Sequence, residues 1–214
     1  TKQSIFTLIK MVLDCTAAPG IFGIDEKYSE ITLTFWFSFF EVFYYYADSY
    51  SDAICDLFDP LVDSLTQILI RKSQYPPAST YNNVWNDDQR EEYRRYRHDL
   101  GDVLSMVVQF PRARSRIFKQ LQGQLEQELQ SFVRFNQTQD ITASQANEPP
   151  WQGLEAIIHA LKSMSESVPF DEDEFIPKVF DAMDQIPFSY CQSVELYCTS
   201  TEMIAAYSDW LFTH

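Results

Sequence analysis

Apolar residues recur at intervals of three and four along most of this chain. Two series show the spacing most clearly: Tyr93, Tyr96, Leu100, Val103, Val107 and Phe110, and further along Phe118, Leu121, Leu125, Leu129 and Phe132. Such spacing places the side chains on one face of an α-helix. No stretch alternates between apolar and polar residues for long enough to predict a strand. The pattern therefore predicts an all-α protein.

Breaks in this pattern divide the chain into about eight helices. Pro19-Gly20 and Phe110-Pro111 interrupt it sharply, and polar loops are expected at 75–86 and 137–148. The expected helices span 2–18, 25–47, 50–74, 87–110, 112–136, 149–168, 171–185 and 190–212.

Individual residues refine the helix ends. Asn86 or Asp87 is placed to cap the helix that follows the first polar loop, and Asn147 to cap the helix that follows the second. Pro60 and Pro177 fall inside helical pattern, and at each we expect either a kink or a first-turn position.

The expected helices group as antiparallel pairs joined by short corners. Roughly 40 residues per pair suits a solenoid of HEAT-like or armadillo-like repeats. We expect residues 1–214 to form one continuous stretch of about four such repeats. Because the chain lacks an initiating Met and begins and ends inside helical pattern, it is expected to be a fragment of a longer solenoid.

One expected helix, 25–47, is unusually aromatic. Nine of the twelve residues from Phe35 to Tyr46 are aromatic. A membrane span needs about 20 mainly apolar residues, so the run is too short to be one. A helix that is apolar nearly all round needs cover, and we expect neighbouring helices to bury it on several sides. Trp151 and Trp210 are expected to fill the core of later helices in the same way.

The charge of the chain is acidic and uneven. The sequence holds 16 basic and 31 acidic residues, a net charge of −15. Residues 140–214 hold 2 basic and 13 acidic residues, a net charge of −11. A general negative field opposes direct binding to nucleic acids and to anionic membranes, and it favours basic protein partners.

Residues that carry catalysis or bind cofactors are sparse. Five glycines argue against phosphate-binding loops and dinucleotide-binding folds. His98, His159 and His214 are scattered without metal-ligand spacing, and Cys191 and Cys198 stand seven apart on one expected helix, which suits packing better than zinc. The four cysteines form no C-x-x-C pair and are expected to be reduced core thiols of a cytosolic or nuclear protein. We expect that the protein is not an enzyme and that it binds neither a cofactor nor a metal ion.

An acidic segment is the first candidate binding site. The run at 171–174 is expected to open the helix 171–185, where negative charge meets the positive end of the helix dipole. That structural role is one interpretation. The other is attraction of a basic partner, together with two carboxylates that share a face of the same helix. The six residues are Asp171, Glu172, Asp173, Glu174, Asp181 and Asp184.

A basic segment is the second candidate. Positive charge at the start of a helix is unfavourable, so the segment needs a compensating partner. Carboxylates of the adjacent repeat are one answer, and an acidic partner protein is the other. The residues are Arg112, Arg114, Arg116 and Lys119. The charged residues of 91–99, including Arg94, Arg95 and Arg97, are expected to form ion pairs within their own helix.

Several short motifs, in order, resemble the karyopherins of the importin-β superfamily. They are Leu13-Asp14-Cys15-Thr16 before Pro19-Gly20, Leu33-Thr34-Phe35-Trp36-Phe37, Arg71-Lys72-Ser73-Gln74-Tyr75-Pro76, Trp85-Asn86-Asp87-Asp88, the segment 92–99, Pro150-Trp151 and Ser208-Asp209-Trp210-Leu211. The resemblance covers essentially the whole chain, and the order of the motifs is more specific than any one of them.

The resemblance implies a right-handed superhelical solenoid of HEAT repeats, with outer A helices and inner B helices. It implies a nuclear transport receptor that shuttles between cytoplasm and nucleus, binds protein cargo, and responds to Ran-GTP mainly through repeats outside this segment. The aromatic helix would then either form plain core or hold pockets for Phe-Gly nucleoporins. The helix 171–185 would be an inner helix. The alternative function is a static helical-repeat scaffold with no Ran-dependent cycle.

Overall fold

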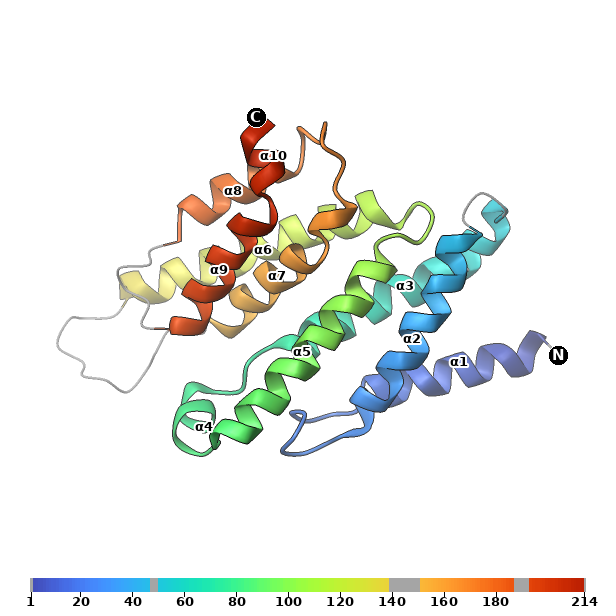
Figure 1. Cartoon of the computed structure of the whole chain (residues 1–214), viewed down its shortest axis with the longest axis horizontal. Coiled ribbons are helices and arrows are strands. Elements are labelled where there is room, and N and C mark those ends of the chain that lie inside the picture. The colour runs from blue at the N-terminus through green and yellow to red at the C-terminus, as the bar shows by residue number, and fades with distance from the viewer. Residues whose placement is uncertain (1, 47–49, 139–150, 187–192, 214) are drawn as a thin grey trace. The chain divides into compact units, whose positions relative to one another are not determined.

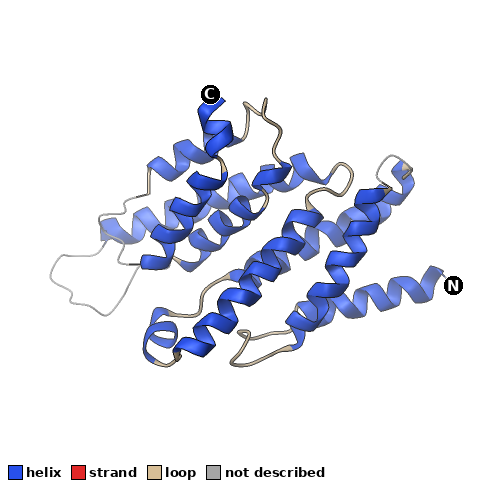
Figure 2. Cartoon of the chain, viewed as in Figure 1, coloured by secondary structure: helices blue, strands red, loops and turns tan. Residues whose placement is uncertain are grey.

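A computed structural model describes residues 2–46, 50–138, 151–186 and 193–213, and within these ranges every regular element is a helix (Figures 1 and 2). One isolated β-bridge, between Phe22 and Glu26, stands outside the helices of this described part. The all-α prediction is confirmed. Among the described helices, none has the length and apolar character that a membrane crossing requires.

The chain divides into two compact units, residues 1–114 and 115–214. The first contains α1 (Lys2–Thr16), α2 (Tyr28–Tyr45), α3 (Asp52–Ser73), α4 (Ala78–Asn83) and α5 (Asp87–Val107). In it α2 packs against α5, with α1 against α2 and α3 against α5; Figure 1 shows α1 and α3 passing behind α2 and α5. The prediction of one continuous stretch of repeats stays a prediction.

The core of the first unit is aromatic and aliphatic. Trp36 and Phe40 of α2 are buried against neighbouring helices, and Phe40 meets Phe110 edge-on at 6.2 Å between ring centroids. Phe22, in the loop before α2, stacks on Tyr96 of α5 at 4.0 Å. Because aromatic rings bury large areas and prefer offset or edge-on contact, this arrangement stabilises the unit.

The aromatic helix is covered on one face only, which corrects the prediction of burial on several sides. The buried residues of α2 are Ser29, Thr32, Leu33, Trp36, Phe40 and Phe43. Its opposite face leaves Ile31 75 per cent and Tyr45 72 per cent exposed. The sequence-based argument missed this because it counted aromatic residues without separating the faces, and tyrosine tolerates solvent at its hydroxyl.

The predicted start of α5 is confirmed in detail. The Asn86 side chain accepts a hydrogen bond from the Gln89 backbone N–H at 2.9 Å, and the Gln89 side chain accepts one from the Asn86 N–H at 3.0 Å. These reciprocal bonds form a capping box that satisfies two donors at the helix start.

The loop expected at 75–86 contains a short helix, α4. Its Tyr81 contacts the ring of Trp85 at 5.7 Å, and Trp85 contacts Tyr93 of α5 at 5.2 Å. Two buried aromatic anchors are too few to show helical periodicity in an otherwise polar stretch, which is why the sequence predicts a loop.

The second unit contains α6, α7 (Gln152–Ser163), the 3-10 helix η2 (Ser165–Ser167), α8 (Ile176–Asp184), α9 (Val194–Ala206) and α10 (Ser208–Thr213). The α6 helix (Ala113–Thr138) belongs to this unit except for its first two residues. α7 packs against α9 and is buried throughout 154–161. Gly153 approaches Glu128 so closely that an added Cβ would lie 2.8 Å from the carboxylate.

Two helix boundaries of the second unit correct the predictions. The helix expected at 171–185 begins only at Ile176. Pro177 occupies its first turn, which is one of the two alternatives expected for this proline. Pro60, in contrast, lies inside α3. The helix expected at 190–212 is replaced by two helices, α9 and α10, because the helical conformation is interrupted at Tyr207. Of the helix expected at 149–168, the described residues 151–168 form a shorter α7 followed by η2.

Of the cysteines, Cys55 is buried as expected, but Cys15 and Cys198 are exposed, so the core prediction is wrong for these two. Cys191, His214, the cap predicted at Asn147 and most of the loop predicted at 137–148 lie outside the described residues.

Candidate protein-binding surfaces

Arg112, the first residue of the basic segment, lies between α5 and α6 and contacts three carboxylates of α3. Its guanidinium lies 3.3 Å from Asp52, 2.6 Å from Asp56 and 3.3 Å from Asp59. The hydrogen bond to Asp56 raises the pKa of the guanidinium. The three aspartates stand four and three apart along α3 and so share one face. The charge of Arg112 is thus matched within its own unit.

The backbone of Arg112, in the turn that follows α5, has an unusual conformation. Its φ angle is 64°, the left-handed region, and it follows Pro111 directly. The sequence predicts a helix that begins at residue 112, but Arg112 lies outside the helix and α6 begins at Ala113. Of the other basic residues, Arg114 and Lys119 are exposed and Arg116 is half-buried. Binding of an acidic partner by these residues stays a prediction.

In the acidic segment, Glu172 differs from its neighbours. Its carboxylate accepts hydrogen bonds from the backbone N–H groups of Glu174, Phe175 and Ile176, at 3.1, 2.5 and 2.7 Å. The run therefore precedes α8 instead of opening it, and one carboxylate reaches forward to cover the free N–H groups at the helix start. The structural interpretation accounts for Glu172.

The remaining carboxylates of this segment face solvent. Asp171 and Asp173 are exposed, and Glu174 is exposed with Lys178 at 3.9 Å. Asp181 and Asp184 are exposed on α8, and in the described part of the chain neither pairs with a cation. Asp184 is the last residue of α8, where the helix dipole makes a negative charge unfavourable. We call Asp171, Asp173, Glu174, Asp181 and Asp184 the acidic α8 surface.

A second charged surface lies on the first unit, between α2 and α5. An open groove of about 600 Å³ there is lined only by charged side chains and one histidine: Glu30, Glu91, Glu92, Arg94, Arg95, His98 and Asp99. Arg94 donates to Glu91 at 2.8 Å, which agrees with the predicted ion pairing within this helix. Arg97 does not belong to this exposed set. It is buried, and its guanidinium lies 4.0 Å from the centroid of the Tyr75 ring.

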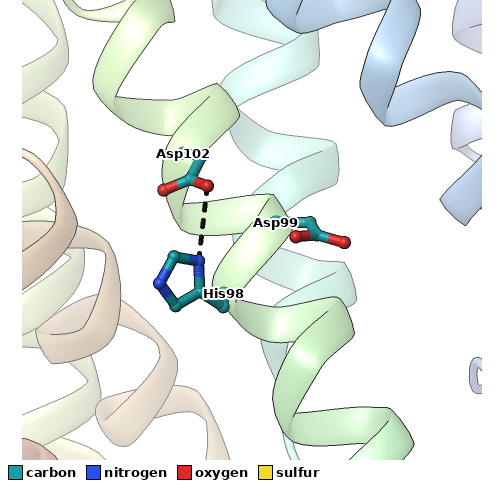
Figure 3. A group of neighbouring side chains, drawn as sticks. All are labelled: His98, Asp99 and Asp102. Carbon is teal, nitrogen blue, oxygen red and sulfur yellow. Dashed lines mark ion pairs between the residues drawn. The ribbon is translucent and has the colours of Figure 1, made fainter.

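His98, Asp99 and Asp102 gather on α5 in the same region (Figure 3). Figure 3 shows His98 turned toward Asp102, and the Nδ1 atom lies 3.3 Å from the Asp102 carboxylate. One ligand atom from each of the three lies within 4.8 Å of the others, so together they could contact a cation. All three are exposed on one helix, and surface groups of this kind are common on acidic helices, so they carry no metal assignment.

Sequence reasoning missed a buried ion pair that joins three segments of the first unit. The Lys72 ammonium lies 2.7 Å from the Glu26 carboxylate, and the two side chains are 5 and 2 per cent exposed. Lys72 also donates to the carbonyl oxygens of Ala18 and Gly20, at 2.5 and 3.3 Å. The two residues stand 46 positions apart, and nothing in the local pattern of either signals the pairing.

Ser29 and Tyr96 complete the surroundings of Glu26. The Ser29 hydroxyl donates to Glu26 at 2.7 Å and lies 2.7 Å from the Tyr96 hydroxyl. Since the serine proton is given to the carboxylate, Tyr96 donates to Ser29. Burial alone would raise the pKa of Glu26, but hydrogen bonds from Lys72 and Ser29 outweigh it and hold that pKa below its ordinary value. Glu26 is therefore ionised at neutral pH.

Comparison with known proteins bears on the whole chain. No protein-family model matches it. Importin-13 from Bos taurus is 28% identical over 215 residues, and importin-13 from Homo sapiens 27% over 215 residues. Each of these alignments covers 99% of this chain and 20% of the relative, so the chain spans one fifth of the length of these relatives. Importin-13 homolog A from Dictyostelium discoideum is 26% identical over 68% of this chain.

A solved structure, described as importin-13 in its cytosolic state, has the same fold. It matches with a TM-score of 0.78 and 26% sequence identity, covering 95% of this chain and 22% of that one. The fold thus defines an all-helical protein of the HEAT-repeat kind. In sequence, the chain is homologous to a segment of the importin-13 proteins over almost its whole length. The motifs of the sequence predict a resemblance to importin-13, with transportin-3 as second choice, and the comparisons confirm the resemblance to importin-13.

Proposed function

We propose that this chain is a segment of a nuclear transport receptor, a helical-repeat protein that binds other proteins and carries them between cytoplasm and nucleus. The observation that carries the proposal is likeness to importin-13 along 99% of the chain in sequence and along 95% in fold. The static scaffold would need the same fold, but no observation favours it.

The partners we propose are protein cargo and the GTP form of Ran, the latter mainly through repeats outside these residues. The receptor would shuttle between the two compartments and would not be an enzyme. A net charge of −15 supports protein partners over direct contact with nucleic acid or insertion into membranes.

Contact with Phe-Gly nucleoporins belongs to the same proposal. On α2 it would fall to exposed aromatic side chains such as Phe37 and Tyr45, because Trp36 and Phe40 are buried in the core. Burial of these two supports the core interpretation for the centre of the helix.

For cargo we propose the acidic α8 surface as the contact of this segment with a basic partner. Asp181 and Asp184 support it best, since both are exposed and unpaired within the described residues and Asp184 stands at an unfavourable helix end. Glu172 is left out because it already caps α8. The basic residues Arg114, Arg116 and Lys119 remain a second candidate, for an acidic partner.

Two measurements on the complete protein test these proposals. A fluorescently tagged copy is bleached continuously in the cytoplasm of living cells while nuclear fluorescence is followed. A receptor loses its nuclear signal within minutes, whereas a scaffold confined to one compartment keeps its distribution and would contradict the proposal.

The second measurement concerns the acidic α8 surface. The double variant Asp181→Lys and Asp184→Lys should weaken binding of a basic cargo and flatten its salt dependence, since exposed charge pairs are screened by salt. The matched control is Asp14→Lys with Asp88→Lys, two exposed aspartates of the first unit with the same change in charge. Equal affinity for cargo in both double variants would exclude the surface.

A further inference from the structure

We propose that a small pocket in the second unit, lined by both apolar and acidic residues, holds one hydrophobic side chain of a basic, extended segment of a partner protein. The inference rests on the proposed function, because it names the kind of partner that this acidic unit would bind.

The pocket lies between the loop after η2 and the junction of α9 with α10. Its volume is about 280 Å³. Val168, Pro169 and Phe170 line one side, and Ala206, Tyr207 and Trp210 line the other. Ligand pockets for drug-sized molecules range from about 300 to 1,000 Å³, so this one suits a single side chain better than a cofactor.

Tyr207, which lies between α9 and α10, and Trp210 line the pocket from its buried side. Tyr207 and Trp210 are buried, with 2 and 8 per cent exposed. The Tyr207 hydroxyl donates to the carbonyl of Leu161 at 2.9 Å, and the Trp210 indole N–H donates to the carbonyl of Glu172 at 2.8 Å. Phe180 stacks on Trp210 with 5.9 Å between ring centroids.

These contacts determine the chemistry that the pocket offers. The polar groups of both rings are already satisfied inside the protein, so neither ring offers a free hydrogen-bonding group to a ligand. The apolar surface open to a ligand comes mainly from the exposed side chains of Pro169, Phe170 and Ala206. Because the rings are held by hydrogen bonds and stacking, little ordering is needed when a side chain enters. Phe170, 69 per cent exposed, stands at the edge as a large apolar surface that a bound segment could cover.

The negative charge around the pocket favours a bound segment in which basic residues flank the apolar residue. Glu166 and Asp209 also line it; both are exposed, and neither pairs with a cation in the described part of the chain. Residues 115–214 hold 5 basic and 15 acidic residues, a net charge of −10. The described lysines Lys162 and Lys178 lie at 2.7 Å from Glu202 and 3.9 Å from Glu174. An apolar surface edged by carboxylates is complementary to a hydrophobic residue flanked by lysines or arginines.

The experiment uses the complete protein and a labelled peptide probe, in which Leu-Phe stands between two runs of three lysines, with binding followed by fluorescence anisotropy. Two control peptides are measured beside it: one with Gly-Ser in place of Leu-Phe, and one with glutamates in place of the lysines. The basic apolar peptide should bind at least about tenfold more tightly than either control, because a buried anchor dominates such interfaces and like charges repel.

Variants then locate the binding. Ala206→Trp fills the pocket from an exposed position, and Glu166→Lys with Asp209→Lys reverses the charge at its edge without touching the core. Each should weaken the probe about tenfold. The matched control is Asp14→Lys with Asp88→Lys, which makes the same change in charge at two exposed aspartates of the first unit and should leave most of the binding intact.

Three outcomes overturn the inference: absence of probe binding, binding that the pocket variants leave unchanged, and equal loss from the Asp14 and Asp88 control. The last would assign the probe to general acidic attraction. None of these outcomes would contradict the transport proposal itself, which the shuttling measurement tests separately. Circular dichroism of Ala206→Trp checks that its fold is retained, and the charge variants decide the matter if it is not.

Discussion

Glu26 and Lys72 form a buried ion pair, with 2.7 Å between carboxylate and ammonium, that ties the loop before α2 to the end of α3. The pair is almost free of solvent, and its hydrogen-bond partners Ser29, Ala18 and Gly20 belong to the first unit. A buried charge is tolerated only when it is paired and hydrogen-bonded, so each residue depends on the other.

Removing one partner should therefore destabilise the first unit strongly. Lys72→Met leaves the Glu26 carboxylate buried without its cation, and the free energy of unfolding should fall by about 3–5 kcal/mol. Adding Glu26→Gln to Lys72→Met should recover part of the loss. Urea denaturation of the two single variants and the double variant measures the coupling. Strictly additive losses would contradict an interaction between the two residues.

The same pair predicts how stability changes with pH. The pKa of Glu26 is lowered on folding, so its contribution is fully present above the ordinary carboxyl value of 4.5 and is lost as the pH falls through the lower folded value. The stability difference between the unchanged chain and Glu26→Gln should shrink as the pH drops below 4.5. The exposed Glu30→Gln serves as control, and it should change stability by no more than about 0.5 kcal/mol. A constant difference for Glu26→Gln would show that Glu26 is not ionised in the fold.

Thr16 is predicted to stabilise the first unit by accepting a hydrogen bond from the indole N–H of Trp36. Trp36 is fully buried, and its indole N–H donates to the Thr16 hydroxyl at 2.7 Å. Thr16→Val keeps the shape but leaves the donor unsatisfied, which should cost about 1–3 kcal/mol. Thr16→Ser should retain most of the stability. Thr201→Val, at an exposed hydroxyl, should change stability by no more than about 0.5 kcal/mol. Equal losses for Thr16→Val and Thr16→Ser would contradict the role of the hydrogen bond.

Glu172 and Asp173 are adjacent but are predicted to respond differently. Glu172→Ala removes the acceptor for three backbone N–H groups at the start of α8 and should destabilise the second unit by about 1–2 kcal/mol. Asp173→Ala, at an exposed side chain, should stay within about 0.5 kcal/mol. Hydrogen exchange at the Ile176 amide gives a local measure, and it should accelerate only in the Glu172 variant.

How much the sequence predicts depends on the distance over which a feature is encoded. The cap at Asn86 and the first-turn position of Pro177 are set by residues within one helical turn, and each is one of the two alternatives that the sequence predicts. The three aspartates of α3 that share a face also stand in the sequence as a regular series. What the sequence hides is that Arg112, 53 to 60 residues away, is the residue they meet.

Features that depend on tertiary packing escaped prediction. Tyr207 continues the apolar spacing of its neighbours in sequence, yet the helix is interrupted there. Its side chain is buried, and its hydroxyl donates a hydrogen bond to the Leu161 carbonyl of α7. The pairing of Glu26 with Lys72 likewise follows only from how α3 meets the loop before α2. Among the candidate binding residues, the sequence could not separate Glu172, whose oxygens accept hydrogen bonds from backbone N–H groups at the start of α8, from the carboxylates that are exposed.

The most direct test of the transport proposal is the effect of the Ran nucleotide on what the complete protein binds. The protein is immobilised and exposed to cell extract with an excess of either Ran-GTP or Ran-GDP, and the bound proteins are quantified. The proposal predicts that the two nucleotide states give different sets of bound proteins, with import cargo released by Ran-GTP. Identical sets in the two states would contradict it and would favour a static scaffold built on the same fold.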